Sequence, residues 1–584
     1  MCGIVSYVGN KDNAVEIVFE GLKKLEYRGY DSWGVFAPGK PNFILKKVGK
    51  ISDYEESNWP KGSIAFGHTR WATHGGITEV NTHPHYSAHH KVIIAQNGVM
   101  ENYSEVKKEL QKKGYKFITG TDTEVIANLF EMYLKTQKDL KQAAKSVFDK
   151  IEGRNAVVVY DLESRKLLGF RNGSPMVLGV SKEELFLASD VAPFIDTTQQ
   201  VVFLNDGEAV LIEDGKYEII DLTSLKTVHR TETVLEISSI ANEKGDKNSF
   251  LEKEIFEQQF IFKETLKQDE KKVTQIATVI KNATMVYCIG AGTAYQVSFW
   301  GAGVLQKIGG KQAFPMIASE FVSQKDFLQK QDVLIIVSQS GETADTLEAI
   351  NAAKEKGLKI ISFVNVESST ICRQSDYVLL HRVGIEKAVA STKAALAPMF
   401  LYYLVAEKMA KVKNNLSKVT SLLSKYVNKD LEQKARNLAR QIYIKENMYL
   451  IGRGMSYPIA REGSIKIQEL SNIHAEGIAG GELKHYAISL IEEGIPCFVI
   501  VGEDEERKHI LSNAMEVKAR GGLIIGFDDQ KNDVFDHYFP LPSLGILKGI
   551  FALIPLQMIA YHLALFRGCD PDYCRNLAKS VTVI

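Results

Sequence analysis

Cysteine is scarce and scattered in this chain of 584 residues. Its six cysteines include no C-x-x-C pair, which argues against a disulfide framework or a structural zinc site and favours a reducing cytosol. They are Cys2, Cys288, Cys372, Cys497, Cys569 and Cys574. We therefore expect a cytoplasmic protein.

The chain also lacks an excess of charge of either sign, because 71 Lys and Arg residues balance 71 Asp and Glu residues. Proteins that hold nucleic acid or an anionic membrane surface normally carry a basic excess, so we expect neither partner. Residues 1–6 show no basic stretch followed by an apolar core, and a signal peptide is not expected.

A long uninterrupted apolar run is missing as well. Residues 544–566 come closest, but polar or helix-breaking residues interrupt them, so they predict a buried helix rather than a membrane span. The interruptions are Lys548, Pro555, Gln557 and His562. With 45% hydrophobic and 24% charged residues, the chain has the composition of a globular protein, and its length predicts three to four domains.

The first 225 residues are typical of an α+β layered domain, in which short β-rich runs alternate with helical patches. Strands are predicted at 64–67, 92–95, 156–160, 184–188 and 209–212, and helices at 14–25, 103–113 and 123–134. Residues 226–280 read as a linker that includes a charged amphipathic helix over 252–272.

The remaining residues alternate strand and helix, which predicts doubly wound parallel sheets. They also contain a repeat: residues 287–295 resemble 449–457 at an offset of 162, and 354–363 resemble 518–527 at an offset of 164. We therefore expect two copies of one α/β unit, at 281–411 and 446–570, joined by a helical connector at 412–445 and followed by a tail at 571–584.

Cys2 directly follows the initiator methionine. A small side chain at position 2 permits removal of Met1, which leaves a cysteine with a free α-amino group of pKa about 7.7–8.0. Nucleophile and general base would then belong to one residue.

Five motifs surround this cysteine in order along the chain. They are Cys2-Gly3-Ile4-Val5, Glu26-Tyr27-Arg28-Gly29-Tyr30-Asp31-Ser32, His68-Thr69-Arg70-Trp71-Ala72-Thr73-His74-Gly75, Asn97-Gly98 and Gly120-Thr121-Asp122-Thr123-Glu124. Together they resemble the glutaminase domain of the N-terminal-nucleophile glutamine amidotransferases. The resemblance covers residues 2 to about 222 and implies an αββα fold for a domain at 2–225.

That resemblance implies that Cys2 attacks the amide of glutamine and that the Asn97 side chain and the Gly98 N–H form an oxyanion hole. The residues implied to bind glutamine are Arg28, Arg70, Thr73, His74 and Asp122, and Trp71 matches the gate of an ammonia passage. Six of the 13 histidines fall between His68 and His90, but no carboxylate or thiol accompanies them at ligand spacing. We expect no metal and no cofactor.

Ser338-Gln339-Ser340-Gly341-Glu342-Thr343 lies between a predicted strand and a predicted helix. Hydroxyls and free backbone N–H groups at a helix N-terminus form an anion site, and without a Walker lysine a sugar phosphate fits better than a nucleoside triphosphate. The alternative is an N-cap with a tight turn. The second copy has four acidic residues, 503–506, at the matching place, so we expect only one copy to bind phosphate.

Glu462, Lys466 and Glu469 are spaced so that they share one helix face. An exposed salt-bridge ladder is the alternative, but the intervening Ile465, Ile467 and Leu470 leave little room for an exposed face. A carboxylate with a lysine beside it is what proton transfer next to a carbonyl requires.

Further motifs make the chain similar to the glucosamine-6-phosphate synthase family, which has two sugar isomerase (SIS) domains. They are residues 338–346, Ala390-Ser391-Thr392-Lys393, His474-Ala475-Glu476, Gly481-Glu482-Leu483-Lys484-His485 and residues 575–583. The resemblance implies a homodimer that makes glucosamine 6-phosphate from L-glutamine and fructose 6-phosphate.

It also implies roles for individual residues. Glu469 moves a proton between C1 and C2 with support from Lys466 and Glu462. His485 assists ring opening, and Lys579 in the tail forms a Schiff base with the ketose. The implied sugar-phosphate contacts are Thr293, Ser338, Gln339, Ser340, Thr343, Val389 and Ser391.

Several positions depart from the family pattern. They are Trp33, Gln96 (often His), Gln259, Ala294 (usually Ser), Tyr486 (usually Gly), Cys574 and Ile584. Ala294 and Tyr486 leave open a paralogue that acts on another ketose or amino-sugar phosphate. A non-catalytic sugar-phosphate sensor is the other alternative, but it would not need Cys2, Glu469 and Lys579 together.

We predict that Met1 is absent from the purified protein, because only then does Cys2 carry the α-amino group. Intact-mass spectrometry measures this directly. A retained Met1 would contradict the assignment of Cys2 as an N-terminal nucleophile.

Overall fold

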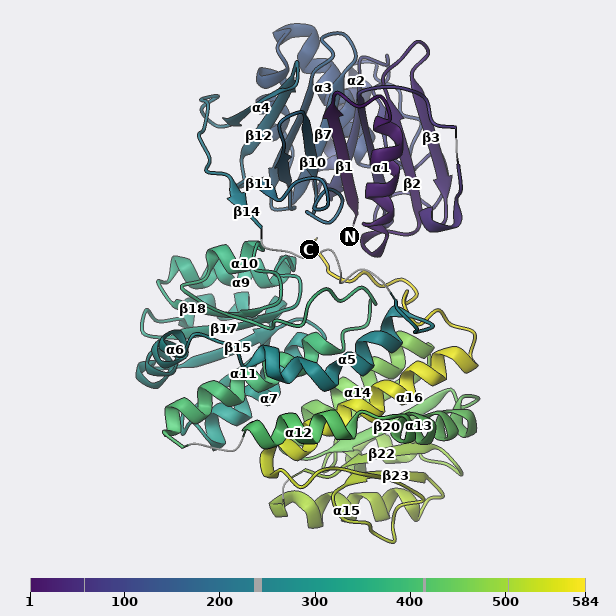
Figure 1. The fold of residues 1–584 in the computed structure, drawn as a ribbon, viewed down its shortest axis with the longest axis vertical. Coiled ribbons are helices and arrows are strands. Elements are labelled where there is room, and N and C mark those ends of the chain that lie inside the picture. Colours follow the sequence, from purple (N-terminus) through teal and green to yellow (C-terminus); the bar gives the residue numbers. More distant parts are fainter. Residues whose placement is uncertain (1, 57, 236–243, 413–415, 503, 583–584) are drawn as a thin grey trace. The chain divides into compact units, whose positions relative to one another are not determined.

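The computed structural model describes all residues except 1, 57, 236–243, 413–415, 503 and 583–584. The chain forms two compact units (Figure 1). The first contains residues 1–241 together with 578–584, and the second contains residues 242–577.

The first unit is built around two stacked antiparallel sheets. The eight-stranded sheet has the order β14-β11-β9-β10-β1-β4-β2-β3, and the six-stranded sheet has the order β13-β12-β8-β7-β6-β5. In the first sheet the strands are β1 (Gly3–Gly9), β2 (Ser32–Ala37), β3 (Phe43–Val48), β4 (Ile64–Arg70), β9 (Val177–Val180), β10 (Glu184–Ala188), β11 (Gln200–Phe203) and β14 (Thr233–Val234). In the second they are β5 (His85–Tyr86), β6 (Val92–Gly98), β7 (Asn155–Asp161), β8 (Leu167–Asn172), β12 (Glu208–Glu213) and β13 (Lys216–Asp221).

Helices cover the outer face of each sheet. Helix α1 (Ala14–Lys23) packs against the first sheet, while α2 (Tyr103–Lys112), α3 (Thr123–Gln137) and α4 (Leu140–Lys150) cover the second. A third apolar cluster fills the space between the sheets. Strands such as β6 and β7 are buried on both faces, which explains their nearly continuous apolar sequences. The predicted αββα layering is confirmed.

Trp33 fits this packing. Its ring is buried beneath α1, where its centroid lies 5.3 Å from that of Phe19 and 5.1 Å from that of Tyr54. The core of the first unit thus accommodates Trp33, although the family pattern has a small residue at this position.

The second unit contains two parallel five-stranded sheets with the same topology, β16-β15-β17-β18-β19 and β21-β20-β22-β23-β24. The first consists of β15 (Val286–Gly290), β16 (Phe314–Ile317), β17 (Val333–Ser338), β18 (Lys359–Val364) and β19 (Tyr377–Leu380). The second consists of β20 (Asn447–Gly452), β21 (His474–Ala479), β22 (Pro496–Ile500), β23 (Leu523–Asp528) and β24 (His537–Pro540). The repeat expected from the sequence is therefore a structural duplication.

Both copies turn from their first strand into a helix at a glycine that has no room for a side chain. A Cβ at Gly290 would lie 2.5 Å from the carbonyl carbon of Ala294, and one at Gly452 would lie 2.2 Å from the carbonyl oxygen of Ser456. The close approach places the start of the helix directly at the carboxyl end of the sheet, where α/β folds bind ligands.

Helices surround these sheets and share one large core between the copies. They are α5 (Phe250–Thr265), α6 (Glu270–Asn282), α7 (Thr293–Lys307), α8 (Ala318–Phe321), α9 (Ala344–Glu355), α10 (Thr370–Gln374), α11 (Lys393–Ala410), α12 (Leu416–Tyr426), α13 (Lys429–Ile442), α14 (Ser456–Ser471), α15 (Asp504–Lys518) and α16 (Leu553–Phe566).

The structure differs from the single helix expected over 252–272. Two helices, α5 and α6, occupy this stretch, because the Asp269 carboxylate accepts a hydrogen bond from Lys271 N at 2.9 Å and starts a new helix. Helix α5 is not a solvated segment either, since Leu251, Ile255 and Phe262 are buried in the shared core.

The apolar stretch near the C-terminus is a core element. Gly545–Phe566 is long and apolar enough to cross a membrane, but 89% of its most apolar window is buried inside the structure. It forms a 3₁₀ segment (Gly545–Ala552) and helix α16, which packs against α13 and α14. The prediction of a buried helix is confirmed.

We predict that Gly301→Ala destabilises the second unit. On α7, a Cβ at Gly301 would lie 2.3 Å from the ring of the buried Tyr402, and such overpacking costs about 1–3 kcal/mol. That outweighs the gain of about 1 kcal/mol from helix propensity.

The matched control is Gly303→Ala on the same helix, where the added Cβ meets the flexible side chain of Met455 at 3.2 Å. Thermal unfolding should show a lower midpoint for the first variant and an unchanged or higher midpoint for the second. Equal midpoints would contradict this account of α7 packing.

Candidate active sites

Cys2 lies at the start of β1, next to the end of β4. Its Sγ accepts a hydrogen bond from Trp71 N at 3.3 Å, and Arg28 Nε donates to the Cys2 carbonyl at 3.1 Å. Arg28 is itself held by an ion pair of 3.2 Å with Asp190. Burial raises the pKa of the Cys2 thiol, so the thiol needs a base to become a nucleophile.

Asn97 and Gly98 end β6, which faces β1 and β4 across the sandwich. The side-chain amide of Asn97 is buried, and neither its nitrogen nor its oxygen has a hydrogen-bond partner among the described residues. Gly98 has a φ of +114°, and a Cβ there would lie 1.8 Å from the Arg154 carbonyl oxygen. An unpartnered donor followed by a glycine whose backbone conformation excludes a side chain suits an oxyanion hole.

Arg70 holds the loop that follows Trp71. Its guanidinium donates to the carbonyl oxygens of His74 (2.5 Å), Gly75 (2.9 Å) and Gly76 (3.1 Å). In the same unit Asp122 is buried at the start of α3 and accepts a hydrogen bond from Met100 N at 2.8 Å. Burial raises the pKa of Asp122, while hydrogen bonds to its carboxylate oppose that rise.

Of the other residues that the resemblance assigns to glutamine binding, Thr73 is exposed, while the ring of His74 packs 4.8 Å from Tyr103.

The buried histidines of this unit lie in contact with one another, with tilted and edge-to-face rings. The ring centroids of His68 and His83 are 4.2 Å apart, and those of His83 and His85 are 4.8 Å apart. Burial lowers the pKa of His68 to about 3 and that of the other two well below the usual value, so all three are uncharged at neutral pH. Within the described part of the chain, no group of three His, Cys, Asp or Glu side chains could hold a metal ion.

In the second unit, α14 brings Glu462, Lys466 and Glu469 together on one face as predicted. The Lys466 ammonium lies 2.6 Å from Glu469 and 3.5 Å from Glu462, and both Glu462 and Lys466 are fully buried. An exposed salt-bridge ladder is therefore wrong for this helix.

Electrostatics couple these three groups. Burial raises the pKa of Glu462 to about 7, although the Lys466 charge opposes the rise. Burial alone would lower the pKa of Lys466, but the two carboxylates outweigh that effect and raise it. The cluster thus contains a permanent cation and a carboxyl group that titrates near neutral pH, as proton transfer requires.

The first copy contributes to this cluster through Thr293 at the start of α7, whose hydroxyl donates to Glu462 at 3.1 Å. At the end of β17, the Ser338 hydroxyl accepts from Gly341 N at 3.0 Å, and the Ser340 hydroxyl accepts from Glu342 N at 3.2 Å. Hydroxyls and N–H groups therefore gather at the N-terminus of α9, where Thr343 is the N-cap residue and Gln339 is half-buried.

The corresponding place in the second copy is different. There Arg453, in the second glycine loop, forms an ion pair of 2.9 Å with Glu506. Arg453 is the cation of this loop, and a carboxylate of the chain itself already neutralises it. This agrees with the expectation that only one copy binds phosphate.

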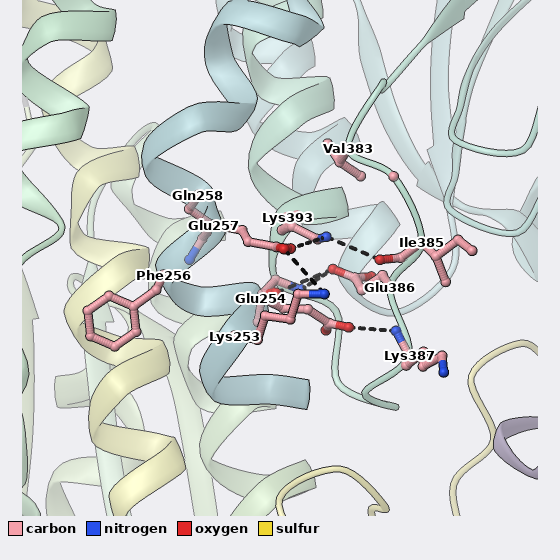
Figure 2. A network of polar contacts seen from close by, with 12 residues as sticks. Lys253, Glu254, Phe256, Glu257, Gln258, Val383, Ile385, Glu386, Lys387 and Lys393 are labelled. Atoms are coloured by element: carbon pink, nitrogen blue, oxygen red, sulfur yellow. Dashed lines mark hydrogen bonds and ion pairs between the residues drawn. The ribbon is translucent and has the colours of Figure 1, made fainter. Parts of the chain in front are cut away.

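Residues that pattern reasoning missed hold the segment before α11 (Figure 2). Glu386 is buried and accepts hydrogen bonds from the Ser391 hydroxyl and from Thr392 N, both at 2.9 Å. From α5, Glu254 accepts from Lys387 N at 2.5 Å, and Glu257 forms an ion pair of 2.6 Å with Lys393 (Figure 2).

The base of the C-terminal tail joins the same network. The Asp572 carboxylate accepts hydrogen bonds from Phe250 N (3.0 Å) and Leu251 N (2.8 Å) at the start of α5, and the Asp572 carbonyl accepts one from Val389 N at 2.9 Å. No local periodicity marks Glu386, Glu254 or Asp572. The only sequence cue is that Glu386 lies just before the Ala390–Lys393 motif.

The structure also describes the two other residues that the resemblance assigns to catalysis, His485 and Lys579. His485 is on an exposed 3₁₀ turn (Leu483–His485), and its ring makes no hydrogen bond with another described residue. Lys579 is half-buried in the segment 578–582, which packs with the first unit. Their catalytic roles stay predictions.

Comparisons with known proteins agree with this division. The SIS domain family matches residues 279–408 and 441–567, and the glutamine amidotransferase domain family matches residues 44–212. The glutamine–fructose-6-phosphate aminotransferase (isomerizing) of Thermococcus kodakarensis is 38% identical and that of Pyrococcus horikoshii is 37% identical, each with complete coverage of both chains. The C-terminal domain of glucosamine-fructose-6-phosphate aminotransferase from Francisella tularensis is 29% identical and superposes with a TM-score of 0.52, covering 56% of this chain and 99% of that one.

We predict that Lys466→Met destabilises the protein more at pH 8 than at pH 6. At pH 6 Glu462 is mostly protonated, because its pKa is about 7, and it does not need the cation. At pH 8 it is mostly ionised, so the native variant must take up a proton or hold an uncompensated buried charge. The loss should be greater at pH 8 by about 1–3 kcal/mol.

Denaturant unfolding at the two pH values measures this difference. The control is Lys484→Met, which removes an exposed ion pair of 3.1 Å with Glu516 and should cost less than about 1 kcal/mol at both pH values. An equal loss at both pH values for Lys466→Met would show that Glu462 does not titrate in this range.

Proposed function

Because the chain belongs to the family of glutamine–fructose-6-phosphate aminotransferases (isomerizing), we propose that it makes glucosamine 6-phosphate and glutamate from L-glutamine and fructose 6-phosphate. The observation that carries the proposal is the buried Glu462–Lys466–Glu469 group, which Thr293 joins to the sheet edge that also bears the Ser338–Thr343 loop. Such a group can transfer a proton on a phosphorylated sugar. The Cys2 site releases the ammonia that becomes the amino group of that sugar.

At the first site, the Cys2 α-amino group takes the thiol proton and the thiolate attacks the glutamine side-chain amide. Asn97 Nδ2 and Gly98 N–H stabilise the tetrahedral oxyanion, each with an effect of roughly 100- to 1000-fold on rate. Ammonia leaves past Trp71, and water releases glutamate from the thioester. The groups proposed to bind glutamine are Arg28, Arg70, Thr73, His74 and Asp122, of which Arg28 and Arg70 also fix the Cys2 carbonyl and the 74–76 loop.

At the second site, Ser338, Gln339, Ser340 and Thr343 hold the phosphate, and Thr293, Val389 and Ser391 line the sugar. His485 assists ring opening, and Lys579 forms a Schiff base at C2 of the open ketose. Ammonia displaces the lysine to give a C2 imine.

Glu469 then carries a proton from C1 to C2, which converts the ketose skeleton to the 2-amino aldose. Lys466 neutralises the carboxylates beside the substrate, and Glu462 near its pKa of about 7 can buffer the proton. The reaction needs no metal and no redox cofactor.

We further propose that the protein works in the cytoplasm as a homodimer, at the first step of amino-sugar precursor synthesis. The lack of a disulfide among the described cysteines supports the reducing compartment. Light scattering of the purified protein tests the assembly.

The decisive experiment incubates the purified protein with L-glutamine and fructose 6-phosphate and measures hexosamine phosphate. Cys2→Ala should abolish glutamine-dependent product but keep product formed from added ammonia. Cys372→Ala, which removes another partly exposed thiol, should behave like wild type. Undiminished glutamine-dependent product from Cys2→Ala would contradict the proposal.

A substrate panel separates the alternatives. A paralogue would prefer another ketose or amino-sugar phosphate, and Ala294→Ser and Tyr486→Gly would then shift the preference towards fructose 6-phosphate. A sensor would bind sugar phosphates in calorimetry without turnover of any.

A further inference from the structure

Gln96 is the most highly connected polar residue next to the proposed oxyanion hole. It is buried on β6, immediately before Asn97. Its side-chain Nε2 donates to Asn155 Oδ1 at 2.6 Å and to Asp122 Oδ2 at 3.4 Å. Its Oε1 accepts from the Thr123 hydroxyl at 2.6 Å.

The backbone of Gln96 is held as well. His68 Nε2 donates to the Gln96 carbonyl at 2.8 Å, and Gln96 N donates to His83 Nδ1 at 3.5 Å. His83 Nε2 lies 2.9 Å from the Thr123 hydroxyl oxygen. Because that hydroxyl already donates to Gln96, the imidazole must donate to it, which leaves Nδ1 free to accept from Gln96 N.

His83, Thr123 and Gln96 thus form a closed ring of hydrogen bonds in which the donor and the acceptor of each bond are fixed. The ring requires an uncharged His83, and burial of the histidine cluster keeps it so. It also fixes which end of the Gln96 amide faces Asp122: the NH₂ group, a donor, faces a carboxylate.

Asp122 needs such donors to act on an amino acid. A carboxylate must be ionised to pair with an α-ammonium group, and burial works against ionisation here. Asp122 Oδ2 accepts hydrogen bonds from Met100 N at 2.8 Å and from Gln96 Nε2 at 3.4 Å. Both bonds favour the ionised form of the carboxyl group.

We propose that Gln96 is a positioning residue that sets the two ends of the glutamine site at once. Its side-chain amide aligns and supports Asp122, which meets the substrate α-amino group. Its pinned backbone fixes the strand end that carries Asn97 and Gly98, which meet the reacting amide. This inference rests on the proposed glutaminase function.

The test compares L-glutamine with 4-carbamoylbutanoate, which is glutamine without its α-amino group. Gln96→Met keeps the length of the side chain but removes both amide functions. We expect kcat/KM for glutamine hydrolysis to fall roughly tenfold or more, since hydrogen bonds to charged groups are involved. The fall for 4-carbamoylbutanoate should be clearly smaller, because that substrate makes no use of Asp122.

Gln111→Met on the exposed face of α2 is the control and should leave both values unchanged. Equal losses for the two substrates in Gln96→Met, or no loss, would overturn the inference. If Gln96→Met does not fold, Thr123→Val can replace it, because it removes the hydroxyl that orients the Gln96 amide. In that variant the ratio of kcat/KM for L-glutamine to kcat/KM for 4-carbamoylbutanoate should decrease.

Two readouts separate this inference from the proposed function. Wild type that hydrolyses no glutamine would contradict the function itself. Wild type that hydrolyses glutamine, together with a Gln96→Met variant of unchanged substrate preference, would contradict the inference alone. Synthesis from added ammonia should persist in the variant and shows that the rest of the chain is folded.

Discussion

The ammonium of Lys466 lies in the protein interior between two carboxylates, and the chemistry proposed for the second unit depends on this arrangement. An isolated buried lysine would lose its proton, and an isolated buried glutamate would keep its own. Together they leave a fixed cation beside a carboxyl of pKa about 7. Thr293, which completes the group, comes from the other copy of the α/β unit, so the site exists only when the two copies share one core.

The two copies of the fold are nevertheless not equivalent at the carboxyl ends of their sheets. The two sheets have the same order, and their glycine turns follow the same steric rule at Gly290 and Gly452. One difference lies at the carboxyl end of the neighbouring strand in each sheet, β17 in the first copy and β22 in the second. One copy offers hydroxyls and N–H groups there, whereas in the other Glu506 pairs with Arg453. The two copies therefore share the same strand order and differ in the loops at the carboxyl ends of their strands.

Sequence patterns predicted the elements well because strand and helix periods are local properties. The helix face of Glu462, Lys466 and Glu469 and the loop from Ser338 follow from spacing alone. The contacts around Gln96 and Asp572 could not be predicted in this way, because their partners are 59 residues away at Asn155 and 321 residues away at Leu251. The charged residues of helix α5 gave no sign of their partners either: Glu254 is buried and binds backbone N–H groups before α11, more than 130 residues away.

Buried carboxylates of the second unit are held by the backbone of the chain itself. Glu254, Glu386 and Asp572 each accept backbone N–H groups, so these carboxylates have their hydrogen-bond partners within the fold. The Asn97 amide is among the buried polar groups of the first unit that have no hydrogen-bond partner within the described residues. Leaving it without a partner is costly unless an acceptor arrives during the reaction. A developing oxyanion is such an acceptor, so the unsatisfied amide agrees with the proposed role of Asn97 in binding a transition state rather than a ground state.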